Sequence, residues 1–265
     1  MTRPSQPTDG LERYVVPNLR NACHILKLLA DRTEGYKTAD IARELDLPVT
    51  TTLRIMATLQ LEGFVRKTES RFELGPVLVH LGNASLSRIE IHDAALPVLQ
   101  SLSTGTDETA HLAVPCDRRS LIVAVHDSAH PLRAASRPGF LADLHCSSTG
   151  KVLLAFHYFD QLDALLARAK PARRTPHTLT TLSEIRREIE LTRKRGYALD
   201  DEEFHAGVRC LAAPVYSSRG TCVAAIGITA AAVRLPRSRV PEIAVLVIAA
   251  AAQLSSRLGF RGPDR

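Results

Sequence analysis

The chain has 265 residues, 45% of them hydrophobic, and a formal net charge of +6. This length and apolar content predict a small domain joined to a larger one with a sizeable core. The most apolar tract, Val240–Leu254, is about fifteen residues long and contains Glu242, so it predicts a packed terminal helix and not a membrane span. We therefore expect no membrane partner.

The N-terminus and the cysteines indicate where the protein works. Residues 1–17 are polar, include Pro4, Pro7 and Gly10, and predict a disordered arm, with no sign of a signal peptide. The five cysteines are scattered and form no CxxC pair. This pattern is typical of the reducing cytoplasm and argues against a disulfide framework or a structural zinc site. We expect a cytoplasmic protein with no cofactor and no metal.

Residues 18–75 predict a winged helix-turn-helix domain. A helix over Leu19–Ala30 comes first, and residues 38–74 are then interpreted as two short helices, a longer third helix and a charged hairpin. The apolar spacing within Ile41–Leu45 indicates a helix that ends before Pro48. Proline disfavours helical backbone at the residue before it but suits the first turn of a new helix.

The third helix, from about Thr50 to Leu61, is the predicted reading element. Its first turns carry hydroxyls and a guanidinium, which suit base edges and phosphates in a major groove. Two alternating runs around Thr68–Ser70 predict a wing whose basic side chains meet flanking backbone or a minor groove. The candidate DNA contacts are Thr38, Thr50, Thr51, Thr52, Arg54, Arg66, Lys67 and Arg71. The same pattern also fits an ordinary helical core with a hairpin, or a protein-binding winged domain.

Bulk charge is weak support for DNA binding here. Residues 1–75 hold eleven Lys and Arg against ten Asp and Glu, whereas Arg168–Arg195 holds nine against three. The placement of the few basic side chains on the third helix and the wing therefore matters more than net charge. The second basic tract is interpreted as a solvated surface.

After the wing, residues 76–92 predict a linker helix with an apolar stripe available to a core or to a partner subunit. Residues 93–260 then alternate between helices and strands. We expect an α+β chain whose second domain has a mainly antiparallel sheet covered by helices. The expected strands are Thr109–Val114, Ser120–His126, Leu132–Ser136, Arg209–Tyr216 and Cys222–Thr229. The expected helices are Ala94–Ser103, Ser147–Arg168 and Thr180–Arg195.

Three polar stretches mark candidate ligand sites in the second domain. In residues 144–151, Ser147, Ser148 and Thr149 precede an apolar helix, where free N–H groups and the helix dipole favour an anion; helix capping alone explains the same residues. Residues 196–203 form an acidic turn beside a strand, a pattern that loop caps and salt bridges also produce. The strand Ala225–Thr229 has a small inward face.

Together these segments resemble the IclR family of bacterial transcriptional regulators. The winged segment, HCSSTGKVLLA (145–155), GYALDDEEFHAGVRCLAAPV (196–215) and AAIGIT (224–229) follow the family's order and spacing. The resemblance implies a winged helix-turn-helix, a linker helix and a GAF-like effector-binding domain, in a homodimer or a dimer of dimers. It also implies binding to a pseudo-palindromic double-stranded DNA operator and control by a small organic acid.

The resemblance further implies the effector site. Backbone N–H groups at Ser148 and Thr149 would hold a ligand carboxylate, and a strand position that is often serine in the family is Gly227 here, which implies a larger pocket. The small residues of the implied apolar wall also favour a ligand larger than a two-carbon acid, with an aromatic acid as one candidate. The implied effector-binding residues are Ala134, Ala142, Ser148, Thr149, Asp200, Val208, Cys210, Gly227 and Thr229.

Two other interpretations stay open from the residues alone. A Cys-dependent enzyme would use Cys146 or Cys210 as its nucleophile, but nothing in the sequence fixes a Cys–His pair, and we expect no enzymatic activity. A metal-sensing regulator would use Asp200, Cys210, His145 and Cys222, which are metal-binding residue types at no diagnostic spacing.

Overall fold

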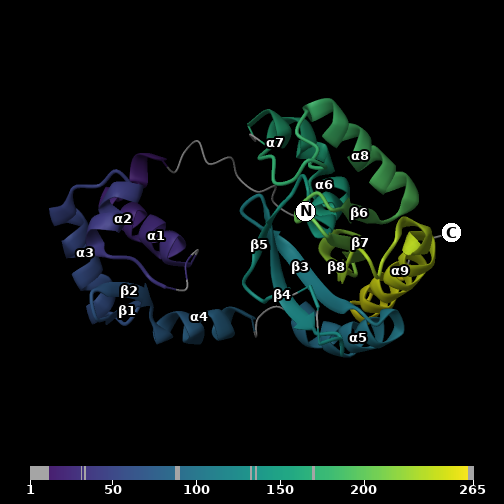
Figure 1. Ribbon diagram of the computed structural model, residues 1–265, viewed down its shortest axis with the longest axis horizontal. Helices are drawn as coiled ribbons and strands as arrows, with labels where there is room; N and C mark the ends of the chain where they lie inside the picture. Colours follow the sequence, from purple (N-terminus) through teal and green to yellow (C-terminus); the bar gives the residue numbers. More distant parts are fainter. Residues whose placement is uncertain are drawn as a thin grey trace. The chain divides into compact units, whose positions relative to one another are not determined.

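The computed structural model describes residues 12–30, 32, 34–86, 90–131, 133–134, 136–168 and 171–261. The chain divides into two compact units, residues 1–88 and 89–265 (Figure 1). Residues 1–11 of the predicted N-terminal arm lie outside the described residues. The rest of that segment holds a short 3-10 helix, η2 (Glu12–Tyr14), two residues without regular structure and the first residue of α1.

The first unit contains three helices around one core, followed by a hairpin and a further helix. The helices are α1 (Pro17–Ala30), α2 (Thr38–Glu44) and α3 (Val49–Leu61). The hairpin pairs β1 (Val65–Thr68) with β2 (Arg71–Leu74) in antiparallel register. Residues 38–74 therefore hold two helices and not the three expected there, while the predicted order of helix, turn, reading helix and wing is confirmed.

The core of this unit forms because apolar residues repeat at helical spacing on each helix and alternate on the hairpin. α2 ends before Pro48, as predicted, and Asp46 takes a positive φ of 52° in the turn between α2 and α3. Tyr36 pairs with Phe72, which ties the segment before α2 to the wing. The buried core residues are Ile25, Leu29, Tyr36, Ile41, Ile55, Met56, Leu59, Val65 and Phe72.

The predicted linker helix falls on two helices. α4 (Pro76–Leu86) follows the wing, and α5 (Glu90–Thr106) opens the second unit; residues 87–89 between them lie outside the described residues. Val79 and Leu81 of α4 are exposed apolar side chains.

The second unit is built on a six-stranded antiparallel sheet with the spatial order β5-β4-β3-β8-β7-β6. Its central pair joins β3 to β8, with Thr109 opposite Thr229. The expected hairpin of the last two strands is present as β7 and β8. The strands are β3 (Thr109–Cys116), β4 (Arg119–His126), β5 (Leu141–Asp143), β6 (Ala198–Asp201), β7 (Val208–Tyr216) and β8 (Cys222–Ala231).

Helices cover both faces of this sheet (Figure 1). α5 and α9 (Val240–Arg257) pack together against β3, β4 and β7, and α6 (Ser148–Phe156) with α8 (Leu182–Arg195) packs on the other side against β6, β7 and β8. Short elements η3 (Phe159–Gln161), α7 (Leu162–Arg168) and η4 (Arg237–Arg239) complete the unit. The predicted α+β class with a mainly antiparallel sheet is thus confirmed.

The last helix has the length and composition of a membrane span, and it is the one such helix among the described residues. In this fold its buried residues, Ile243, Val247 and Leu254 among them, belong to the core, and α9 packs on α5 and β7. It is the packed terminal helix that the sequence predicted.

Three predicted elements differ from the observed ones. Residues 147–168 are broken into α6, η3 and α7, because after Phe156 the chain turns and His157 Nδ1 lies 2.7 Å from the carbonyl oxygen of Cys222. The acidic turn at residues 198–201 is the edge strand β6. The described residues 133, 134 and 136 form no strand, and β5 lies further on, at Leu141–Asp143.

Candidate DNA-reading surface and effector cavity

The outward surface of α3 carries part of the predicted DNA contact set. Thr50 and Arg54 are exposed and Thr51 is half-buried. Thr52 is 0% exposed, and its hydroxyl donates to the carbonyl of Pro48 at 3.1 Å. The prediction that Thr52 contacts DNA is therefore wrong, because each helical step turns the side chain by about 100° and places this one in the core.

The N-terminus of α3 is open to an anion. Pro48 stands at the N-cap position and provides no side-chain hydrogen bond to the first turn. The first N–H groups of a helix have no partner within the helix, so those of α3 are available to a phosphate. Thr38 begins α2 and is half-buried.

The three predicted wing residues are exposed, and each has a partner inside the unit. Arg66 donates two hydrogen bonds to one carboxylate oxygen of Glu73, at 3.0 and 2.8 Å. Arg71 donates to the carbonyl of Gly35 at 3.1 Å, and the Lys67 ammonium lies 5.6 Å from the centre of the Phe72 ring. Two of these cations keep their full charge for DNA, whereas the charge of Arg66 is partly neutralised.

A cavity of about 420 Å³ in the second unit brings together most of the predicted effector residues. Seven of the nine line it: Ala142, Ser148, Thr149, Asp200, Val208, Cys210 and Thr229. They come from β5, the start of α6, and the strands β6, β7 and β8. Seven residues that the resemblance implies thus come from five separate elements and lie around one cavity.

The other two predicted effector residues do not line this cavity. Ala134 is half-buried outside it. Gly227 lies between Ala212 and His111 in the sheet, and an added Cβ would come within 2.9 Å of the Ala212 Cα and closer still to the backbone oxygen of Leu211. A serine hydroxyl has no room here, so the expectation that a lost hydroxyl enlarges the pocket is wrong.

Several lining residues were not predicted, most of them because they lie on strands or loops that carry no motif. They are His111, Ile122, Ser136, Arg137, Phe140, Ser147, Phe204 and His205. Three of them, Ser147, Phe204 and His205, lie inside the stretches quoted above. Phe140 and Phe204 meet edge to face with ring centres 5.8 Å apart, which gives the cavity an aromatic wall.

The start of α6 points free backbone donors at the cavity. Ser147 caps the helix: its hydroxyl accepts from the N–H of Gly150 at 3.1 Å and donates to the carbonyl of Asp143 at 2.6 Å. Among the described residues, the N–H groups of Ser148 and Thr149 have no acceptor. Two free donors at the positive end of a helix dipole can accept a carboxylate.

A second set of groups lining the cavity is polar and neutral. Thr229 Oγ1 lies 3.3 Å from His111 Nδ1 and 3.1 Å from Ser136 Oγ, and it accepts from Cys210 Sγ at 3.5 Å. Burial lowers the pKa of His111 to about 4, so the imidazole is neutral near pH 7. These groups can exchange hydrogen bonds with a hydroxyl or carbonyl, and the Arg137 side chain, which also lines the cavity, is a cation.

Asp200 is buried at the edge of the cavity and holds the loop after β6. One carboxylate oxygen accepts from the N–H groups of Glu203 and Phe204, at 2.8 and 3.2 Å. Burial, which outweighs the nearby Lys151 charge, raises the pKa of Asp200 to about 7. Lys151 is itself buried; it donates to the Leu199 carbonyl at 2.8 Å and pairs with the Glu203 carboxylate.

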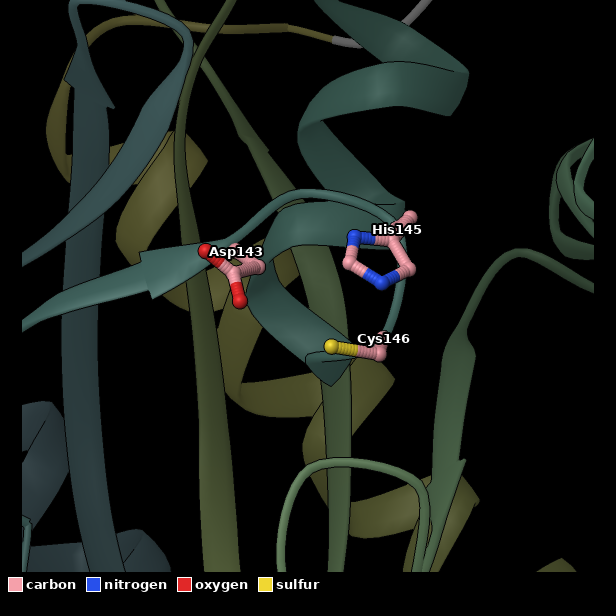
Figure 2. Close-up of side chains that lie close together, drawn as sticks. All are labelled: Asp143, His145 and Cys146. Carbon is pink, nitrogen blue, oxygen red and sulfur yellow. The ribbon is translucent and has the colours of Figure 1, made fainter. Parts of the chain in front are cut away.

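A separate cluster lies just before α6. Figure 2 shows Asp143 at the end of β5, with His145 and Cys146 on the loop that follows. Their ligand atoms all lie within 4.8 Å of one another, as in a metal site. Asp143, however, is already paired with Arg174 at 2.5 Å and Arg119 at 3.4 Å.

The two alternative chemistries fit these positions poorly. Cys222 lies opposite Tyr216, at the far end of β7 from Cys210, so the four residues suggested for a metal sensor are not brought together. Burial raises the pKa of Cys146 to about 12 and that of Cys210 well above its ordinary value. Both thiols are therefore protonated near neutral pH and are poor nucleophiles.

A winged helix-turn-helix unit followed by a sheet unit with a ligand-sized cavity is the architecture of a DNA-binding transcriptional regulator. Residues 19–69 match the IclR helix-turn-helix domain. Residues 83–256 match the family model described as bacterial transcriptional regulator IclR C-terminal. The chain belongs to the IclR family of bacterial transcriptional regulators.

Individual relatives agree over nearly the whole chain. It is 32% identical to the HTH-type transcriptional regulator BhcR of Paracoccus denitrificans, with 89% of this chain and 85% of that protein covered. It is 29% identical to the transcriptional repressor IclR of Escherichia coli, covering 92% and 90%. The crystal structure of the Thermotoga maritima IclR is similar with a TM-score of 0.69 and 28% identity, covering 92% of this chain and 99% of that one.

Proposed function

We propose that this protein is an effector-controlled regulator that works as a homo-oligomer in the cytoplasm. Two copies of α3 enter successive major grooves of a pseudo-palindromic operator, while Lys67 and Arg71 on each wing contact flanking backbone. A small organic acid in the cavity of the second unit changes the affinity for DNA, which it can do only by binding the two arrangements of the protein unequally.

The observation that carries the ligand assignment is the pair of free N–H groups at Ser148 and Thr149. They face a cavity whose walls are apolar and aromatic and which also holds neutral polar groups around Thr229. A ligand that fits carries a carboxylate, an apolar or aromatic body and a second polar group. A volume of about 420 Å³ exceeds what a two-carbon acid fills.

Replacing Ser148 by proline tests this assignment directly. Ser148 is the first residue of α6, a position that tolerates proline, and the preceding Ser147 already has the extended backbone that proline requires. Ser148→Pro removes one N–H while the helix stays in place. Ser148→Ala is the matched control, because it removes the hydroxyl and keeps the N–H.

The measurement is a thermal-shift screen of small carboxylic and aromatic acids, each beside its primary amide. A run with chelator is included because Asp143, His145 and Cys146 lie close together. We expect acids to stabilise the wild type and Ser148→Ala, amides to act weakly, and Ser148→Pro to lose at least ten-fold in acid affinity, the loss of about one charge-assisted hydrogen bond. Equal acid binding by Ser148→Pro and Ser148→Ala would contradict the carboxylate site.

A further inference from the structure

The outward face of α3 is partly apolar. Thr52, Ile55, Met56 and Leu59 are buried, so they fix which side of the helix meets the core. The opposite side is exposed and carries Thr50, Leu53, Arg54 and Ala57. Leu53 is 50% exposed and stands between Thr50 and Arg54 on that surface.

The surroundings of Leu53 suit DNA better than a protein partner. The sequence of α3, VTTTLRIMATLQL, contains one cation and no acidic residue, and its uncapped N-terminus adds positive potential. An apolar protein surface laid over Leu53 would also cover Arg54, which forms no ion pair on its own helix, and burying an unpaired charge is unfavourable. A DNA groove accepts both groups.

One base edge in the major groove is apolar: the C5 methyl group of thymine. We propose that Leu53 contacts this methyl group in each half-site of the operator, beside the base or phosphate contacted by Arg54, with Ala57 extending the apolar strip by one turn. The proposal rests on the proposed function, since it requires α3 to lie in the groove. It makes Leu53 a specificity-determining residue that recognises a methyl group, whereas a polar side chain at this position would recognise a hydrogen-bonding group of a base.

The experiment selects duplexes with full-length wild-type protein from a random-sequence library and then removes methyl groups from the enriched duplex. The enriched sequence is resynthesised with deoxyuridine in place of thymidine, one position at a time and in symmetric pairs. We expect one position per half-site at which loss of the methyl weakens wild-type binding about four-fold, and about fifteen-fold for the symmetric pair.

Leu53→Ala should bind the methylated and unmethylated duplexes equally at that position, while it keeps its other base preferences. Leu61→Ala is the matched control: it truncates a leucine that is 87% exposed at the far end of the same helix, and it should remain methyl-sensitive. If every deoxyuridine duplex binds wild type unchanged, or if Leu53→Ala keeps the full methyl effect, the assignment of Leu53 is overturned. If no sequence is enriched, DNA reading by α3 is overturned together with it.

Discussion

A single carboxyl group, that of Asp200, serves both the cavity and the loop beside it. It lines the cavity, and the same oxygen that accepts the N–H groups of Glu203 and Phe204 holds the chain at the end of β6. The group is buried among polar neighbours, and burial raises its pKa to about 7. Its charge therefore changes close to physiological pH, although its hydrogen bonds to the backbone do not need that charge.

We predict that Asp200→Asn flattens the dependence of stability on pH. The folded-state pKa of about 7 lies above the ordinary 3.8, so the folded protein binds a proton that the unfolded chain releases earlier. This contribution is fully present below the ordinary pKa and is lost as pH rises through 7. Asparagine keeps the accepting oxygen and has no titration.

The check is urea unfolding of both proteins at pH 5 and pH 8. The wild type should lose about 2 to 3 kcal/mol more than Asp200→Asn between these conditions. Parallel pH profiles for the two proteins would show that this carboxyl group does not titrate in the folded state as inferred.

At the scale of elements, an ion pair within the wing reduces the positive charge that the wing offers to DNA. Arg66 of β1 and Glu73 of β2 are directly opposite each other in the hairpin and form a two-bond ion pair. Cross-strand pairs of this kind stabilise a short hairpin modestly, and this one also withholds a cation from DNA.

We predict that Glu73→Gln raises DNA affinity and steepens its dependence on salt. A freed Arg66 adds about one phosphate contact per protomer, so the slope of log K against log salt should become more negative by about 0.9 per protomer. Glu69→Gln, at the exposed turn of the wing, removes the same charge without freeing an arginine and should leave the slope nearly unchanged. The slopes are measured by fluorescence anisotropy over a salt series; equal changes in both variants would contradict the role of the pair.

The elements that the sequence predicted well are those whose pattern is local. The alternation in β3, β4, β7 and β8 and the helical spacing around Ile41 and Ile55 suffice to place them. β6 was missed because Asp200 and Asp201 look like a solvated turn. Asp200 lies near the Lys151 charge and Asp201 pairs with Arg209, and both cations come from other elements, so no local pattern contains that information.

The residues of the site could be predicted where they lie in or near a recognisable motif, and not elsewhere. Motif matching placed seven of nine effector residues at one cavity, but the residues between motifs, such as His111 and Phe140, could not be found without the fold. The predictions for Thr52 and Gly227 are wrong because they use the residue type and not the direction in which the side chain would point. One turns into the helical core, and the other has the backbone of β7 where a side chain would stand.

At the scale of the whole molecule, the two units have separate cores. The first is built from α1 to β2, and the second from the sheet and the helices that cover it. Substitutions inside one core should therefore act mainly on the stability of that unit, because each unit is stabilised by its own core.

We predict two separable thermal transitions. Ile55→Ala removes core volume in the first unit and Ile226→Ala does so in the second, and each should cost about 2 to 5 kcal/mol in its own unit. Differential scanning calorimetry should show one transition moving in each variant, and an effector acid should raise only the transition that Ile226→Ala lowers. A single transition that shifts in both variants would show that the units unfold as one.

Because β3 pairs with β8 at the centre of the sheet, the first unit can fold during synthesis before the second unit does. The first unit has its core complete once β2 has emerged, whereas the sheet cannot close until Thr229 is available to pair with Thr109. At bacterial synthesis rates that delay is on the order of ten seconds. During this interval every new chain carries a folded DNA-binding unit while its second unit is still incomplete. We expect the near balance of eleven basic against ten acidic residues in residues 1–75 to keep the nonspecific DNA affinity of this incomplete, monomeric chain low. The nascent protein then does not stay bound to the genome before an effector can control it.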